Sequence, residues 1–257
     1  MLRMDSPPLN PYAPPTTPAD ESQTRATASG EYRPLFGRAT AVTVILGIEA
    51  AMEVVSIIVS VVTIGVMNGI IAGEEASQST LEGIDASTRA LAAVQLVSFI
   101  AAAIAFCMLV ARANRNARSF EQMLMEFTPG SAVGYFFVPI ASLVQPYRAM
   151  AEIWRASEPK VEDHPRMSLV PLPALLPGWW AAFLVHALCG QVGFYASKDL
   201  KSAHDFVVHG YVELVASAVT IVAAVLAIAL VRALARRQDA CQSAAEVRRS
   251  ALGAAAV

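Results

Sequence analysis

The stretch ATAVTVILGIEAAMEVVSIIVSVVTIGVMNGIIA, residues 39–72, decides the fold class of this chain. It runs for 34 residues with only two charged side chains, Glu49 and Glu53. A transmembrane helix needs about 20 consecutive apolar residues, and a helix as long as this stretch would measure roughly 50 Å against a hydrocarbon core of about 30 Å. The stretch therefore predicts a membrane-spanning helix that tilts or projects beyond the bilayer.

Three further apolar stretches of spanning length follow along the chain. The composition agrees with a membrane protein, because 55% of the residues are hydrophobic and 16% are charged, whereas soluble proteins carry about 25% charged residues. We therefore predict an all-α integral membrane protein, a four-helix transmembrane bundle within residues 35–237. Its predicted spans are residues 41–72, 91–111, 171–195 and 206–231.

The segments outside the spans differ from them in composition. Residues 1–34 hold seven prolines and predict a disordered tail with polyproline II character, suited to a protein partner that recognises proline. Residues 73–90 are predicted to be a polar loop, and residues 238–257 a C-terminal tail. Residues 132–144 are apolar but too short to span, so the segment 131–157 is predicted to be interfacial, either re-entrant or flat on the membrane surface.

Lysines and arginines set the predicted orientation. The residues before the first span carry four, the segment between the second and third spans seven and the residues after the fourth span five, whereas the two other loops carry one and two. Cytoplasmic loops carry an excess of these residues, so both termini are predicted to be cytoplasmic. The net charge of −2 lacks the basic field that nucleic-acid binding needs, so no nucleic-acid partner is expected.

Small and polar residues recur along one face of each span. In the first span they are spaced four, three, four and three residues apart, from Glu49 to Thr63. Such stripes let helices pack closely in lipid and form hydrogen bonds between helices. Carboxylates are costly inside a membrane and usually have a partner there, so Glu49, Glu53, His186 and Glu213 form a candidate intramembrane polar cluster. Two roles are possible for this cluster. It either only packs the helices together, or it relays protons or binds a cation.

Motifs for catalysis and metal binding are missing from the chain. It has no P-loop, H-E-x-x-H, G-x-S-x-G or C-x-x-C motif. The three cysteines, Cys107, Cys189 and Cys241, have no paired spacing and predict neither a disulfide framework nor a zinc site. No catalytic residue, metal or cofactor is therefore predicted. The missing motifs favour a protein that is not an enzyme. The alternative is an enzyme that works inside the membrane with the carboxylates of the polar cluster and His186.

The segment between the second and third spans carries the most distinctive motifs. They are ARANRNAR at 111–118, TPG at 128–130, AVGYFFVPI at 132–140, QPYRAM at 145–150 and EIWRAS at 152–157, followed by PGWW at 177–180. In order and spacing these motifs resemble the bacterial membrane family called domain of unknown function 4328, over about residues 40–235. The resemblance implies a polytopic protein of a bacterial membrane, here predicted to be the cytoplasmic (inner) membrane, and implies no activity.

The same segment offers candidate contacts for anionic lipid headgroups, each worth about 1 kcal/mol near a membrane surface. These are Arg112, Arg115, Arg118, Arg148 and Arg155. The alternative is that they only fix the topology. The stretch from Pro146 to Arg155 is predicted to be a helix with an apolar face that ends at Trp154. On its other side Arg148 and Glu152 are predicted to form an ion pair. The helix is predicted to lie on the cytoplasmic surface of the membrane. Asn114 and Asn116 are predicted to bind the backbone of the re-entrant segment.

Two functions of different classes follow from these features. The proline-rich tail and the amphipathic segment favour a non-enzymatic membrane scaffold or regulatory protein. Its partners would be the lipid bilayer, a protein bound to the tail and, in a homo-oligomer, a second copy of the chain. The alternative is a small transporter or a proton- or cation-coupled channel that uses the intramembrane carboxylates. Its weakness is size, because four helices rarely enclose a path without forming an oligomer.

Overall fold

The computed structural model describes residues 31–120, 124–160 and 167–255, and this part of the chain is mainly helical and contains no strand. The predicted proline-rich tail lies outside the described residues as far as residue 30. The helices are α2 (Phe36–Ile71), α3 (Gln78–Ser119), α4 (Pro129–Gly134), α5 (Gln145–Ala156), α6 (Leu175–Ala196) and α7 (Ala203–Ala255). Short 3-10 turns lie at Ala141–Leu143 (η1), Met167–Leu169 (η3) and Ser197–Asp199 (η4).

Four helices of the described chain are long and apolar enough to cross a membrane, namely α2, α3, α6 and α7. Between 17% and 28% of the residues in their most apolar stretches are buried inside the protein. The remaining surface includes large aliphatic side chains such as Ile58, Val97 and Val225, each more than half exposed. A continuous apolar surface of this extent needs lipid to cover it. The prediction of an all-α membrane protein with four spanning helices is confirmed.

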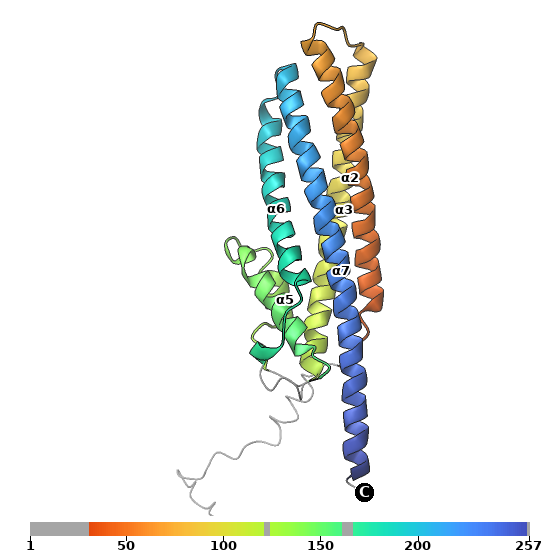
Figure 1. Ribbon diagram of the computed structural model, residues 1–257, viewed down its shortest axis with the longest axis vertical. Helices are drawn as coiled ribbons and strands as arrows, with labels where there is room; N and C mark the ends of the chain where they lie inside the picture. Colours follow the sequence, from red (N-terminus) through yellow and green to blue (C-terminus); the bar gives the residue numbers. More distant parts are fainter. Residues whose placement is uncertain (1–30, 121–123, 161–166, 256–257) are drawn as a thin grey trace, which may run out of the picture.

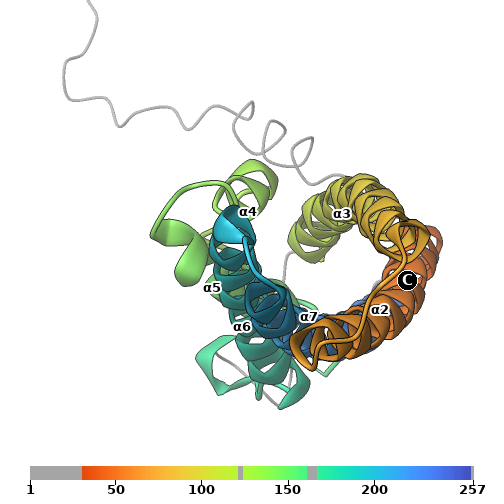
Figure 2. The ribbon, with the colours of Figure 1, turned by 90° about the horizontal axis from the view of Figure 1, so that it is seen from above.

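The four long helices stand side by side in an arc. α2 packs along both α7 and α3, and α6 packs along α7, so the order around the arc is α3, α2, α7, α6 (Figure 2). At one end, α4 and α5 lie beside α3 and α6 (Figure 1). We call this end the α5 end, and the opposite end, with the α2–α3 and α6–α7 connections, the loop end.

A glycine sets the close approach of α2 and α7. A Cβ added at Gly210 of α7 would lie 2.7 Å from Ile64 Cγ1 of α2. That distance is shorter than carbon atoms tolerate, so the missing side chain allows the two helices to pack at this height. Small residues serve the same purpose at many helix contacts in membranes.

α3 begins earlier than predicted, because most of residues 73–90 form its first turns rather than a polar loop. Ser77 caps the helix by accepting a hydrogen bond from the N–H of Thr80, 3.2 Å away. One turn further, Asp85 and Arg89 form an ion pair of 2.8 Å on the exposed face. Caps and pairs four residues apart stabilise polar helices. The change in polarity therefore marked the edge of the apolar span and not the end of the helix.

α7 is also longer than its predicted span. It contains 53 residues, about 80 Å of helix, and includes the predicted C-terminal tail as far as Ala255. Figure 1 shows it reaching well beyond the α5 end of the other helices. The extra turns are rich in Ala and Arg, which are good helix formers even without apolar partners.

The segment between α3 and α6 differs from the predicted surface helix. The buried face of α5 includes Ala149, Met150 and Ile153, at most 1% exposed, and these belong to the same core as residues of α3, α6 and α7. Protein therefore covers the apolar face that we expected to meet lipid. Phe137 and Ile140, before α5, are 71% and 84% exposed, and the re-entrant or flat placement of this stretch stays a prediction.

The predicted ion pair between Arg148 and Glu152 does not form. The Glu152 carboxylate instead accepts hydrogen bonds from the main-chain N–H groups of Glu126 and Phe127. Arg148 pairs with Glu126, 3.2 Å away. A buried carboxylate that accepts two N–H bonds is held more strongly than an exposed pair four residues apart. Glu152 thus ties α5 to the segment that follows α3.

Candidate functional site

A cavity of about 460 Å³ lies inside the arc and has walls from α2, α3, α6 and α7. Phe136 and Phe137, which follow α4, line it on the side of the α5 end. Leu96, Phe99 and Phe137 line the cavity and are also 61%, 54% and 71% exposed on the outer surface. These three side chains mark the mouth of the cavity. Leu96 and Phe99 belong to α3, the helix at one end of the arc, and Figure 2 shows the arc open between α3 and α6.

Aromatic rings form much of the wall near the α5 end. The Phe106 ring lies 5.6 Å from the Trp179 ring and 5.9 Å from the Phe136 ring, centroid to centroid. Phe183 lies 6.2 Å from Trp179 and stacks on Trp180 at 5.2 Å. These spacings are typical of aromatic pairs that stabilise a core. The cluster joins α3, the turn after α4 and α6, so it connects the two sides of the open arc at the α5 end.

The polar side chains of the cavity lie on four different helices. Gln95 of α3 donates a hydrogen bond to Glu53 of α2 over 3.3 Å. His186 Nδ1 of α6 lies 2.9 Å from Thr220 Oγ1 of α7, and that hydroxyl donates to the Ala216 carbonyl. Because the single hydrogen of that hydroxyl goes to Ala216, an N–H at His186 Nδ1 would complete the pair.

Glu49 is the exception among these polar groups. Its side chain lines the cavity and is 8% exposed, and its Oε1 atom is buried with no hydrogen-bond partner within the described chain. Ser98 of α3 interacts with the Glu49 carboxyl by a side-chain hydrogen bond, and Glu53 lies one turn along α2. A buried acceptor atom without a donor costs about 1–3 kcal/mol. The Oε1 atom of Glu49 is therefore an acceptor at the cavity wall that no side chain of the described chain satisfies.

The structure brings the predicted cluster together in part. Glu49, Glu53 and His186 line one cavity, as the sequence analysis proposed for a common face, but Glu213 does not line it. Glu213 lies further toward the loop end, where its Oε1 is 3.9 Å from His209 Nε2 and packs beside Gly193 of α6. It still interacts with Glu53, which also contacts Ser217. Glu53 thus connects the cavity to a second polar pair.

A buried polar network, which we call the base network, joins α3 and α7 at the α5 end. Gln238 of α7 is fully buried and donates to the Ala113 carbonyl and to Ser157 Oγ, at 2.8 and 3.0 Å. Its Oε1 accepts a bond from Asn116 Nδ2, 2.9 Å away. Asn116, also fully buried, bonds both the N–H and the carbonyl of Arg33. One pair of amides therefore ties α3, α7, the end of α5 and the segment before α2.

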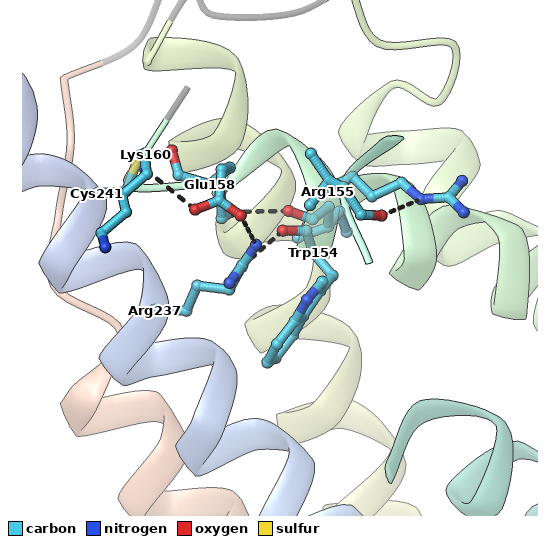
Figure 3. A network of polar contacts seen from close by, with 9 residues as sticks. Trp154, Arg155, Glu158, Lys160, Arg237 and Cys241 are labelled. Atoms are coloured by element: carbon cyan, nitrogen blue, oxygen red, sulfur yellow. Dashed lines mark hydrogen bonds and ion pairs between the residues drawn. The ribbon is translucent and has the colours of Figure 1, made fainter. Parts of the chain in front are cut away.

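The base network continues through Arg237 (Figure 3). Its guanidinium donates to the Glu158 carboxylate over 2.7 Å and to the Trp154 carbonyl over 2.9 Å. The same group lies over the Trp154 ring, 4.6 Å from its centroid. The Arg237 and Glu158 side chains are 17% and 11% exposed. A nearly buried, stacked pair of this kind locks the end of α5 against α7.

Tyr32 adds to this end of the molecule. It packs on Phe120, with ring centroids 5.7 Å apart. Burial, and then the nearby Asp239 carboxylate, raises the pKa of the Tyr32 phenol to about 12. The phenol is therefore neutral at every physiological pH and acts as a packing group.

Most of the five candidate headgroup arginines bind main-chain oxygens. Arg112 donates to the Glu31 carbonyl, Arg118 to the carbonyls of Met125 and Phe127, and Arg155 to the Val170 carbonyl. Arg148 pairs with Glu126 and remains half exposed, and Arg115 is exposed. Contact with lipid headgroups stays a prediction, and the two exposed arginines are the ones free to make it. Asn114 donates to the Phe127 carbonyl, which precedes the predicted re-entrant segment, and Asn116 bonds Arg33 and Gln238. The prediction that these two amides bind the backbone of that segment is therefore wrong.

The sequence analysis missed Gln238 and the aromatic end of the cavity. A signal for Gln238 was present, because Leu230, Leu234, Gln238 and Cys241 recur at four, four and three residues and are all fully buried. That period continues the buried face of the fourth span past its arginines. Phe136 and Phe137 carried no such signal, since they lie in a turn.

Within the described residues, no group of three His, Cys, Asp or Glu side chains is placed to hold a metal ion.

The chain was compared as a whole with known proteins. No curated protein and no solved structure matches the chain. The model of the family described as domain of unknown function (DUF4328) matches residues 72–236, which begin at the end of α2 and not near residue 40. The match includes α3, α4, α5, α6 and the spanning part of α7, with the cavity walls that these helices supply. It covers more than half of the chain, and the protein therefore belongs to the family of the domain of unknown function (DUF4328).

Proposed function

We propose that this protein binds a small apolar or amphiphilic molecule from the bilayer and acts as a regulatory or interaction protein of the bacterial cytoplasmic membrane. The cavity carries the proposal, because all four spanning helices line it and three of its lining side chains, Leu96, Phe99 and Phe137, are exposed where lipid would reach them. Its size of about 460 Å³ is within the range of small-molecule sites, which span roughly 300–1,000 Å³. The bacterial setting rests on the resemblance of the motifs between α3 and α6.

A cavity-filling substitution tests the binding role. In Ala223→Phe a ring would occupy space that Ala223 of α7 leaves open. We expect 1-bromooctane to quench the fluorescence of Trp179 saturably in the wild-type protein in lipid nanodiscs, and at least about tenfold more weakly in the variant, a loss of about 1.4 kcal/mol of binding free energy. The matched control is Ala218→Phe, on the exposed face of the same helix. Equal quenching in all three proteins would show that the bromine reaches Trp179 from bulk lipid, and the proposal would fail.

The α5 end is proposed to be cytoplasmic. It carries Arg112, Arg115, Arg148 and Arg237, whereas the loop end carries Arg89, Lys198 and Lys201. The excess of positive charge on one side sets the orientation of membrane proteins. A reporter enzyme that is active only in the cytoplasm is expected to be active when fused after Val257. Activity restricted to the other side of the membrane would reverse the topology.

A second candidate function, movement of protons or cations, is favoured by the polar groups beyond the cavity. Glu53 interacts with Glu213, and Glu213 lies close to His209 near the loop end. Ionisable groups inside membranes are typical of such paths. Liposomes with the wild-type protein would then pass protons or sodium ions, and Glu213→Gln would slow the flux at least about tenfold. Absence of flux from well-folded wild-type protein would remove this function and leave the binding role intact.

A further inference from the structure

The cavity wall carries two acidic side chains. Glu49 and Glu53 both line it, and none of the residues that line it is a lysine or an arginine. Its imidazole, His186, is already engaged with Thr220. Gln95 supplies one donor to Glu53 and nothing to the unpartnered Oε1 of Glu49. Two acidic side chains of one helix therefore face the cavity with no lysine or arginine beside them, and a cation bound there would favour their ionised form.

Aromatic rings surround the same space. Phe99, Phe106, Phe183 and Trp179 line the cavity together with the two phenylalanines on the side of the α5 end. The faces of aromatic rings carry partial negative charge and attract cations, more strongly where water is excluded. The ring faces and the carboxylates thus favour the same ligand charge, while the remaining apolar lining favours hydrocarbon substituents.

We infer that the cavity binds a hydrophobic organic cation, such as an amine or a quaternary onium ion with apolar substituents. The cation would pass between α3 and α6 from the bilayer, and its charged centre would lie against Glu49 and Glu53 with its substituents among the aromatic rings. The inference rests on the proposed function, since it names the chemical class of the molecule that the cavity takes. It also explains why Glu49 Oε1 has no partner within the described protein.

Two probes of nearly the same shape and opposite charge test the inference. They are tetraphenylphosphonium and tetraphenylborate, and each is titrated against the full chain in nanodiscs. The signal counted for each ion is the saturable binding of the wild-type protein minus that of Ala223→Phe. Partition of the ion into lipid is the same in both samples and is removed by this subtraction. We expect the phosphonium to bind at least about tenfold more tightly than the borate, as a site with two carboxylates requires.

Variants then locate the charge. Glu49→Gln and Glu53→Gln are each expected to weaken phosphonium binding about tenfold or more and to weaken the saturable binding of the neutral probe 1-bromooctane by much less. Glu82→Gln, the same change on the exposed surface of α3, is the matched control and should change neither. The comparison of the two ions needs no glutamate variant. It therefore still tests the inference if the Glu49→Gln protein fails to fold.

The outcomes separate the inference from the function beneath it. Equal binding of the two ions, or phosphonium binding that neither glutamate variant weakens, would overturn the cation and leave a neutral ligand site if 1-bromooctane still binds saturably. Binding of none of the three probes would overturn both the inference and the proposed function. Preference for the phosphonium, lost in the two glutamate variants and kept in Glu82→Gln, would establish the cation site.

Discussion

An Arg237→Met variant is expected to lose about 3–5 kcal/mol of unfolding free energy, the cost of removing one partner from a nearly buried ion pair. The guanidinium lies 2.7 Å from the Glu158 carboxylate, donates to the Trp154 carbonyl and covers the Trp154 ring. Methionine keeps most of the apolar stem and removes the charge, so the Glu158 carboxylate stays in its buried place without the guanidinium. Reversible unfolding in mixed micelles, followed by tryptophan fluorescence, measures the loss.

The neighbouring residue provides the control for Arg237. Arg236 is exposed on the same turn of α7, and Arg236→Met is expected to change stability by less than about 0.5 kcal/mol. Arg237→Lys should fall between the two, because an ammonium keeps the charge but cannot bind two acceptors and stack on the ring as a guanidinium does. Equal losses for Arg236→Met and Arg237→Met would show that charge at this end, and not the Glu158 and Trp154 contacts, stabilises the protein.

Gln238→Leu is the second large effect, with an expected loss of about 3 kcal/mol. Leucine is close to glutamine in volume and makes none of its three hydrogen bonds, to Asn116, the Ala113 carbonyl and Ser157. Each lost bond leaves a buried polar group behind, and such a group costs about 1–3 kcal/mol when nothing replaces its partner. The same unfolding measurement gives the value.

Two further variants decide whether the Gln238 network acts as a unit. Gln242→Leu, one turn along α7, loses only an exposed bond to Glu246 and should change stability by less than about 0.5 kcal/mol. Asn116→Leu combined with Gln238→Leu should cost less than the sum of the two single changes, because each amide is left unsatisfied by loss of the other. Strict additivity would mean that the two amides do not depend on one another.

The extent of the spans follows from local sequence, and so it was predictable. A stretch of apolar residues long enough to cross the bilayer is a property of neighbouring residues, as in residues 39–72, and the helices of the structure overlap every predicted span. The helix ends were less predictable. Residues 78–90 and 238–255 are polar and helical, because capping at Ser77 and good helix formers act independently of hydrophobicity.

The candidate site was predictable only as a face of each helix. The stripe that contains Glu49 and Glu53 identified the inner side of α2, and His186 the inner side of α6. The height of Glu213 relative to these residues was not determined, because stripes on separate helices have no common origin until the helices are packed. The structure places Glu213 beyond the cavity, next to His209.

By itself, the sequence determined that this protein is an all-α membrane protein with four spans and a stripe with two glutamates on the first, since hydrophobic length and helical period are set by neighbouring residues. Only the tertiary structure decided that the helices form an arc open between α3 and α6, that α5 is covered by protein, and that Gln238 meets Asn116 from 122 residues away. Such contacts depend on how whole helix surfaces fit together, and no local pattern encodes that fit.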